Sequence, residues 1–254
     1  MSQTSPPHSA ARKLITRLAR STLDAVAPPA CPVTGDRVSA PATLSYRAWG
    51  LVRFIDDPMC PRCGVPFERQ SDEGYLCGAC LSIEPAFDRA RAAAVYDEAI
   101  KGLILSFKHG DRTDLAPLFG RMLARAGGEL IRPETILVPA PLHWRRRVAR
   151  RFNQAGLLAA ALGREAGCRV ETDLLVRRRA TKPMREMSTA ARKRNVAGAI
   201  VAAPGARAAL DGAHVIVVDD VFTSGATISA CARALRRAGA AKVDALTLAR
   251  VLKT

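Results

Sequence analysis

The sequence lacks the long apolar runs and the signal segments that mark membrane and secreted proteins. No apolar run reaches the roughly 20 residues that a membrane-spanning helix needs. Between residues 10 and 27, apolar residues recur at helical spacing, but interleaved basic residues prevent the continuous core of a secretion signal. We therefore expect a cytoplasmic protein without a membrane span, in which the thiols stay reduced.

Aromatic and acidic residues are also scarce. Phe, Trp and Tyr make up 5% of the chain, which leaves few rings to stack on the bases of single-stranded nucleic acid. The 23 acidic residues are outnumbered by 39 basic ones, giving a net charge of +16. The basic residues gather at 145–151 and 177–194, where arginine side chains suit phosphate groups and attract polyanions such as single-stranded DNA. An arginine-rich solvated surface is the alternative interpretation.

The most informative segment is residues 215–227. Its first four residues, from Val215 to Val218, are all β-branched, which is typical of a strand buried on both faces of a parallel sheet. Asp219 and Asp220 follow at the predicted carboxyl end of this strand. Open α/β sheets bind their ligands at that end, so the two acids are candidate site residues.

A short loop of hydroxyl-bearing and small residues comes next and leads into a predicted helix. Thr223 or Ser224 is expected to cap the helix, and Gly225 lets the backbone approach a ligand closely. Backbone N–H groups at a helix start bind phosphate. The acids repel phosphate and suit sugar hydroxyls or a metal ion instead, so the segment predicts a sugar-phosphate site. An ordinary strand–loop–helix junction is the alternative.

Residues 215–227 resemble the phosphoribosyl pyrophosphate (PRPP) signature of type I phosphoribosyltransferases at all thirteen positions. The resemblance implies that Asp219 and Asp220, the presumed catalytic pair, hold the ribose hydroxyls. It also implies that the following residues bind the donor's 5′-phosphate: Val221, Phe222, Thr223, Ser224, Gly225, Ala226 and Thr227. In such an enzyme a phosphoribosyl group leaves pyrophosphate while Mg²⁺ neutralises the leaving group. Four further residues would then surround the pyrophosphate: Pro139, Ala140, Arg185 and Arg194.

Four cysteines form a second strong signal. They occur as two C-x-x-C pairs with thirteen residues between the pairs, and their members are Cys60, Cys63, Cys77 and Cys80. This spacing predicts one structural zinc ion held by four thiolates. A redox pair or disulfides are the alternatives, but a redox C-x-x-C normally occurs once and disulfides need an oxidising compartment.

Three other cysteines lie outside this set. Cys31 begins a segment that looks like a C-x-x-C-G knuckle, except that Thr34 replaces its second cysteine. A threonine hydroxyl is a poor zinc ligand, so we expect no second ion there. Cys168 and Cys231 are expected to be small core residues.

The cysteine ribbon followed by the PRPP segment resembles the ComF family, competence-associated proteins with a double zinc ribbon and a type I phosphoribosyltransferase-like domain. Segments 138–143, 151–155 and 192–199 also agree with that family. Two departures are the Arg150–Arg151 pair, where the family has Gly, and segment 181–185, which lacks a common Gln. The resemblance implies a role in natural competence and DNA uptake.

Pro and Gly residues mark the expected boundaries of three parts of the chain. These are an extension (1–27), a zinc-ribbon module (28–85) and a phosphoribosyltransferase-like α/β domain (86–254). Expected strands are 92–96, 136–139, 174–177, 215–219 and 243–248, and expected helices are 97–108, 115–130, 153–166 and 225–238. Their alternation predicts a mainly parallel sheet with right-handed crossovers. We detect no internal repeat.

Two classes of function follow from the sequence. The first is a Mg²⁺-dependent phosphoribosyltransferase that binds PRPP or a phosphoribosyl nucleotide. The second is a nucleotide-sensing or single-stranded-DNA-handling module of the competence machinery that kept the fold and lost turnover. A zinc-ribbon adaptor is a weaker third interpretation. No segment identifies an acceptor base.

Overall fold

The computed structural model describes residues 28–68, 74–109, 112–142, 153–179 and 198–252, and it forms two compact units that meet in sequence between Gly50 and Leu51. Where it is described, the first unit has a tight loop bridged between Ala30 and Arg37, followed by the short helix α2 (Tyr46–Leu51) at the boundary. The second unit holds the four-cysteine ribbon with helix α3 (Gly78–Ser82), and the sheet. The expected boundary at residue 85 stays a prediction.

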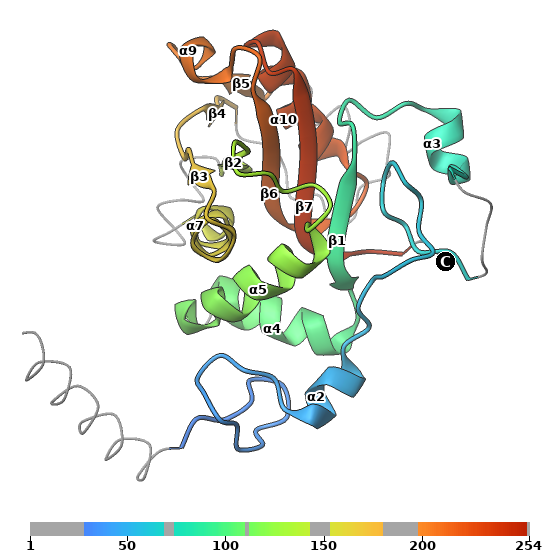
Figure 1. Cartoon of the computed structure of the whole chain (residues 1–254), viewed down its shortest axis with the longest axis vertical. Coiled ribbons are helices and arrows are strands. Elements are labelled where there is room, and N and C mark those ends of the chain that lie inside the picture. The colour runs from blue at the N-terminus through green and yellow to red at the C-terminus, as the bar shows by residue number, and fades with distance from the viewer. Residues whose placement is uncertain (1–27, 69–73, 110–111, 143–152, 180–197, 253–254) are drawn as a thin grey trace, which may run out of the picture. The chain divides into compact units, whose positions relative to one another are not determined.

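Five parallel strands form the sheet of the second unit (Figure 1). They are β1 (Ala90–Val95), β2 (Ile136–Pro139), β3 (Arg169–Val170), β6 (His214–Phe222) and β7 (Lys242–Arg250). Their order across the sheet is β1-β7-β6-β2-β3, and every neighbouring pair is parallel. The predicted α/β class with a mainly parallel sheet is therefore confirmed.

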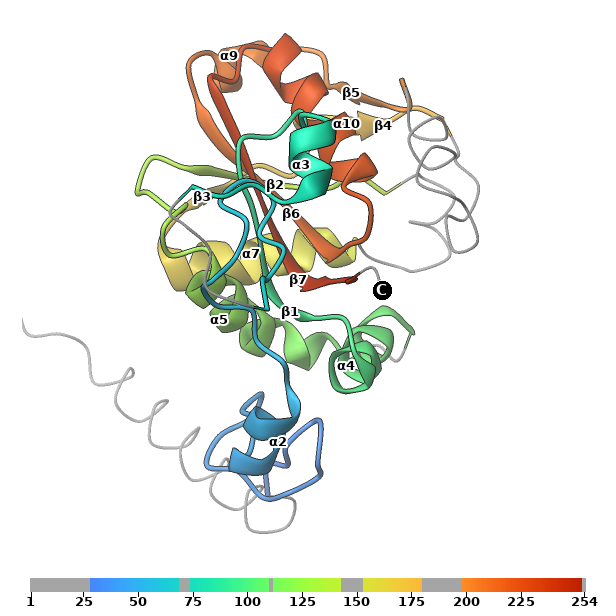
Figure 2. The ribbon, with the colours of Figure 1, turned by 90° about the vertical axis from the view of Figure 1, so that its right-hand side faces the viewer.

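Helices pack on both faces of this sheet (Figures 1 and 2). The helices that follow β1 are, in chain order, α4 (Glu98–His109), the 3₁₀ turn η1 (Thr113–Leu115), α5 (Ala116–Ala126), α7 (Gln154–Ala166), α9 (Arg207–Leu210) and α10 (Ala226–Arg237). Of these, α5, α7 and α10 contact the strands of the sheet. Side chains alternate between the faces of a strand. Leu137 and Leu246 point to one face, against Gly163 of α7 and against Gly127 just after α5.

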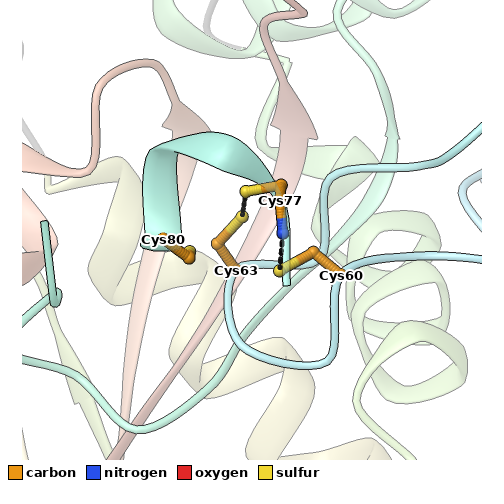
Figure 3. A group of neighbouring side chains, drawn as sticks. All are labelled: Cys60, Cys63, Cys77 and Cys80. Atoms are coloured by element: carbon orange, nitrogen blue, oxygen red, sulfur yellow. Dashed lines mark hydrogen bonds between the residues drawn. The ribbon is translucent and has the colours of Figure 1, made fainter. Parts of the chain in front are cut away.

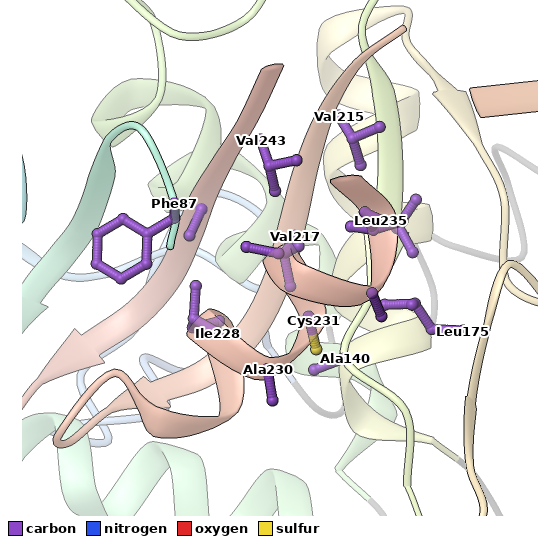
Figure 4. Close-up of a cluster of buried hydrophobic side chains, with 14 of the residues drawn as sticks. Phe87, Ala140, Leu175, Val215, Val217, Ile228, Ala230, Cys231, Leu235 and Val243 are labelled. Atoms are coloured by element: carbon purple, nitrogen blue, oxygen red, sulfur yellow. The ribbon is translucent and has the colours of Figure 1, made fainter. Parts of the chain in front are cut away.

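The opposite face carries the main hydrophobic cluster, shown in Figure 4. Val215 and Val217 of β6 and Val243 of β7 pack there against Ile228 and Leu235 of α10. Three of the ribbon cysteines and Phe87 belong to the same cluster. The cysteine ribbon therefore packs as part of the sheet's own core, which fixes it relative to the strands that carry the site.

Some elements differ from those expected. The predicted strand 174–177 is β4 (Leu175–Arg177), but it pairs antiparallel with β5 (Ile200–Ala202) in a separate two-stranded sheet. The short elements β3, β5, α2, α3 and α9 were not predicted. They are too short for a periodic pattern, and their pairing or packing partners decide their conformation.

Strand β6 also continues past its expected end at Asp219. It runs to Phe222 because β7 keeps pairing with it: Asp219 lies opposite Thr247, and Phe222 opposite Arg250. The two acids are consequently inside the strand rather than after it, and the loop toward α10 begins at Thr223.

Candidate functional site

The two adjacent acids of β6 extend toward different elements. Lys108, in the last turn of α4, forms an ion pair with Asp220, with 2.6 Å between Lys108 Nζ and Asp220 Oδ2. Asp219 interacts electrostatically with the same lysine, and also with Arg177 of β4 and with Cys231 of α10. Its Oδ1 accepts a hydrogen bond from the backbone N–H of Asp220 at 2.9 Å. One site thus holds two carboxylates in two different environments.

Asp219 holds its proton more tightly than an ordinary aspartate. Burial raises its pKa, and the charge of Asp220 raises it further. The backbone N–H of Asp220 and the cations Lys108 and Arg177 lower it, so that the resulting pKa is about 7. A cation or a hydroxyl donor placed beside this carboxyl group would favour its ionised form. The position is therefore suited to a ligand that brings one of these.

The segment of residues 223–227 leads from β6 into α10 and includes the first two residues of that helix; it is called the phosphate loop here after its predicted role. Gly225 precedes α10 in the left-handed conformation, with φ of +69°, and no side chain caps the helix. The expected cap by Thr223 or Ser224 is therefore wrong, because Gly225 turns the chain into the helix on its own. A Cβ on Gly225 would lie 2.8 Å from Cζ of Phe222, so the loop lies directly against that ring.

Two buried hydroxyls at the site, Ser224 Oγ and Thr247 Oγ1, have no hydrogen-bond partner within the described residues. Ser224 belongs to the phosphate loop, and Thr247 is the cross-strand neighbour of Asp219. Most buried polar atoms in folded proteins are hydrogen-bonded. Two unpaired hydroxyls on either side of the acids are consistent with a ligand that completes their hydrogen bonds.

The predicted residues at the end of β2 lie beside the acids. Pro139 pairs with Val218 in the sheet, and the N–H of Ala140 donates to the carbonyl of Val218 at 2.8 Å. Asn153, which precedes α7, donates from Nδ2 to the Ala140 carbonyl at 3.5 Å, and its buried Oδ1 has no hydrogen-bond partner among the described residues. The structure therefore brings the end of β2, the acids and the start of α7 together.

Lys108 and Thr247 lie at the site although no sequence motif pointed to them. In the sequence, Lys108 looks like an ordinary cation at the end of a helix. Thr247 looks like one more residue of a buried strand. Only the sheet order, which places β7 beside β6, identifies Thr247. The predicted Arg185 and Arg194, and the basic cluster at 145–151, lie outside the described residues.

The four predicted zinc ligands come together, as Figure 3 shows. Their sulfur atoms all lie within 4.8 Å of one another, with 3.6 Å between Cys63 Sγ and Cys77 Sγ. A tetrahedron with Zn–S bonds of about 2.3 Å has edges of about 3.8 Å, so this separation fits a zinc site. The backbone N–H of Cys77 points to Cys60 Sγ at 3.5 Å, and all four thiols are free of disulfides.

The pKa values of the clustered thiols are shifted in different directions. Burial raises the pKa of Cys80, and the charge of Cys63 raises it further. Burial acts in the same direction on Cys60, but backbone N–H groups of neighbouring residues lower its pKa to about 7. Four thiolates at this spacing repel one another unless a cation compensates them. The donor set and its geometry therefore fit Zn²⁺.

The first unit repeats the backbone of this cysteine knuckle. The N–H of Cys31 donates to the carbonyl five residues later at 2.7 Å, and Cys60 does the same at 2.9 Å. Gly35 and Gly64 both have positive φ, of 74° and 69°, and both donate to the carbonyl of the cysteine four residues earlier. A short helix follows each knuckle. The expectation that the chain has no internal repeat is therefore wrong for the backbone.

In the first ribbon, hydrogen-bonded side chains lie at positions that correspond to the predicted metal ligands of the second ribbon. By this correspondence Cys31, Thr34, Ser45 and Ala48 stand where the second ribbon has Cys60, Cys63, Cys77 and Cys80. Thr34 Oγ1 and Ser45 Oγ lie 2.8 Å apart and donate to Oδ2 of Asp36 at 2.7 and 3.0 Å. The N–H of Ala48 donates to Ser45 Oγ at 3.2 Å. A polar network thus links the two halves of this ribbon.

Two family models match the chain. A double zinc ribbon domain matches residues 22–81, and a phosphoribosyl transferase domain matches residues 152–254. The first match covers both ribbons, and the second covers the acids, the phosphate loop and β7. Within the described part of the chain, no helix has the length and apolar character to cross a membrane.

Three curated proteins resemble the chain over most of its length. DNA utilization protein YhgH of Escherichia coli K12 is 34% identical, over 82% of this chain and 94% of that protein. Competence protein F of Haemophilus influenzae is 29% identical, over 76% and 85%. Competence protein ComFC of Bacillus subtilis is 26% identical, over 82% and 84%. Each of these similarities extends over at least three quarters of the chain.

Proposed function

Because the chain belongs to the ComF family, we propose that it binds PRPP, or a nucleotide through its 5′-phosphate, at the carboxyl ends of β6 and β2. We also propose that this binding serves the handling of DNA taken up by the cell. The names of the relatives support the second part. The cytoplasm is the proposed location, because it keeps the cysteines reduced.

The observation that carries the proposal is the phosphate loop. It combines a glycine at positive φ, the start of the twelve-residue helix α10 and the buried, unpaired hydroxyl of Ser224. Backbone N–H groups and the helix dipole favour an anion at such a start. A phosphate oxygen would accept the hydrogen bond that Ser224 Oγ does not make to any described residue.

The two acids would bind the ribose of the proposed ligand. Asp219 and Asp220 would accept hydrogen bonds from the ribose hydroxyls, while Thr227 and the loop amides hold the 5′-phosphate. Mg²⁺ prefers carboxylate and phosphate oxygens, so it would arrive with PRPP and be held by the same acids. When bound, it would neutralise pyrophosphate as a leaving group. Arg185 and Arg194 are proposed as additional contacts to the pyrophosphate.

The second candidate is a module that binds a nucleotide or single-stranded DNA without turnover. The net charge of +16 favours this candidate. It predicts DNA binding that weakens steeply with salt, because protein cations release counterions from the phosphates. Salt-independent binding would argue against it.

Isothermal titration with PRPP, with and without Mg²⁺, tests the proposal. We expect Asp219→Asn and Thr227→Ala to weaken binding by about ten- to a hundredfold, since each removes hydrogen bonds to a charged ligand. Asp211→Asn is the matched control, because Asp211 is exposed at the end of α9. Wild-type protein that binds neither PRPP nor a nucleoside 5′-monophosphate would refute the proposal. PRPP binding without release of pyrophosphate from PRPP, when a pool of acceptor bases is supplied, would favour the non-catalytic module.

A further inference from the structure

Arg250, the last residue of β7, connects the cysteine cluster with the sheet. Its side chain is almost fully buried, with 9% exposure. Nη1 donates to the backbone carbonyl of Cys63 at 2.7 Å, and Nη2 lies 3.4 Å from Cys63 Sγ. Arg250 thus contacts both the backbone and the sulfur of one predicted metal ligand. Burial raises the pKa of the Cys63 thiol, and the charge of Arg250 acts in the opposite direction.

The same guanidinium group packs on Phe222, the last residue of β6. Arg250 Cζ lies 4.4 Å from the centroid of the Phe222 ring, within the range of a cation–π interaction. The two residues are cross-strand neighbours, and the N–H of Val251 donates to the carbonyl of Phe222 at 2.9 Å. Phe87 packs edge-on against the ring, with 5.9 Å between the centroids. The position of Phe222 is therefore set by Arg250, β7 and Phe87.

Phe222 in turn supports the phosphate loop. The ring lies so close to Gly225 that a Cβ there would clash with Cζ at 2.8 Å. A displaced ring would therefore either push against Gly225 or leave a gap beneath it. A continuous series of contacts runs from Cys63 through Arg250 and Phe222 to Gly225.

We propose that Arg250 is a positioning residue that couples metal binding at the four cysteines to the conformation of the phosphate loop. A metal-bound thiolate fixes Cys63 and accepts a charge-assisted hydrogen bond from the guanidinium group. Arg250 then holds Phe222 beneath Gly225. Without the metal, Cys63 loses its fixed place, and the support beneath the loop loosens.

Coupling of this kind works in both directions. If metal binding favours the ordered loop, a ligand in the loop favours retention of the metal by the same factor. This consequence for affinity rests on the proposed function, because it requires a ligand in the loop. The effect of the metal on the loop itself does not.

Hydrogen exchange of the amides at 223–228, measured by mass spectrometry without ligand, is the first test. We expect exchange to accelerate when zinc is removed from the wild-type protein. In zinc-loaded Arg250→Met the loop should exchange as fast as in the zinc-free wild type, while the amides of 60–66 remain protected. Arg237→Met is the matched control, because Arg237 is exposed at the end of α10. Equal loop exchange in zinc-loaded wild type and Arg250→Met would overturn the coupling.

Metal affinity separates a specific role from a general loss of stability. Arg250→Met should weaken zinc binding by about tenfold in competition with a chromogenic chelator, as outer partners of metal ligands typically do. It should also shift the thiolate-to-metal absorption of the Co²⁺-loaded protein, and Arg250→Lys should restore part of both effects. Phe222→Leu should keep the zinc affinity and lose the protection of the loop. This second variant tests the series of contacts even if Arg250→Met does not fold.

PRPP titration then distinguishes this inference from the proposed function. We expect zinc removal to weaken PRPP binding in the wild type and to leave the already weak binding of Arg250→Met unchanged. If zinc-loaded wild type binds neither PRPP nor a nucleoside 5′-monophosphate, the proposed function fails, and loop exchange still decides the coupling. If PRPP binds wild type and Arg250→Met equally, with or without zinc, the coupling fails and the proposed function stands.

Discussion

Lys108 Nζ lies 2.6 Å from Oδ2 of Asp220, and this ion pair joins the end of α4 to the middle of the candidate site. Both side chains are largely buried, with exposures of 18% and 19%. The negative charge of the Asp220 carboxylate is thereby compensated by a cation of the protein itself. A cationic ligand at Asp220 must share this carboxylate with Lys108.

We predict that Lys108→Met destabilises the protein by about 1–3 kcal/mol, because it leaves a largely buried carboxylate without its cation. Urea unfolding measures the change. Asp220→Asn in the same background should recover most of the loss, since the pair is then replaced by two neutral groups. Simple additivity of the two single variants would show that the ion pair does not contribute to stability.

A second prediction concerns pH. The pKa of Asp219 is raised from 3.8 to about 7 in the folded protein. Between these values the folded state binds a proton that the unfolded chain has released, so this group's contribution to stability falls as the pH rises toward 7. Asp219→Asn should remove this contribution, which amounts to at most about 4 kcal/mol. Urea unfolding between pH 4.5 and 8 measures it, and pH profiles of variant and wild type that run parallel would contradict it.

A third prediction concerns Gly225. Alanine there must adopt positive φ and meet the Phe222 ring, so Gly225→Ala should cost about 1–3 kcal/mol of stability. Gly205→Ala is the control, because Gly205 also has positive φ but has open space around its Cβ position. Thermal unfolding should show a larger loss for Gly225→Ala. Equal losses would mean that backbone strain alone acts at Gly225.

A fourth prediction concerns the first ribbon, in which hydrogen bonds between Thr34, Asp36 and Ser45 occupy the place of a metal. Native mass spectrometry should find one zinc ion per wild-type chain. The triple variant Thr34→Cys, Ser45→Cys, Ala48→Cys should bind two, because it restores four thiolates on a backbone of the same form. The single variant Thr34→Cys should still bind one. Two ions in the wild type, or one in the triple variant, would contradict the correspondence of the two ribbons.

The sequence predicted the parts of the site that are determined within a single short segment of the chain. The β-branched run before Asp219 identified a buried parallel strand, and the spacing of the cysteines identified a cluster whose geometry fits zinc. Both patterns arise from local chemistry, that is, from burial on two faces of a sheet and from tetrahedral thiolate coordination.

The rest depends on residues that meet only in the fold. The extension of β6 to Phe222 is decided by pairing with β7, and the partner of Asp220 comes from α4. Only one knuckle of the first ribbon was visible in the sequence, because Cys31 and Gly35 keep its turn while Thr34 and Ser45 replace cysteines; the matching second half appears only in the fold. The wrong prediction of the cap of α10 has a similar cause: nearby hydroxyls suggested a side-chain cap, and the packing of Gly225 on Phe222 made one unnecessary.

The strand order determines which contacts can form while the chain is still being synthesised. β1 follows the cysteine ribbon in the chain, yet its neighbour in the sheet is β7, which the ribosome makes after β2, β3 and β6. Until β7 emerges, β1 has no partner strand in this sheet, and Cys63 lacks Arg250. The nascent ribbon can acquire its metal early, but its docking onto the sheet must wait for one late strand. A ribosome stalled before residue 242 would therefore hold a chain in which the four cysteines and residues 215–227 have both been synthesised. The contacts of Arg250 that connect them would still be missing.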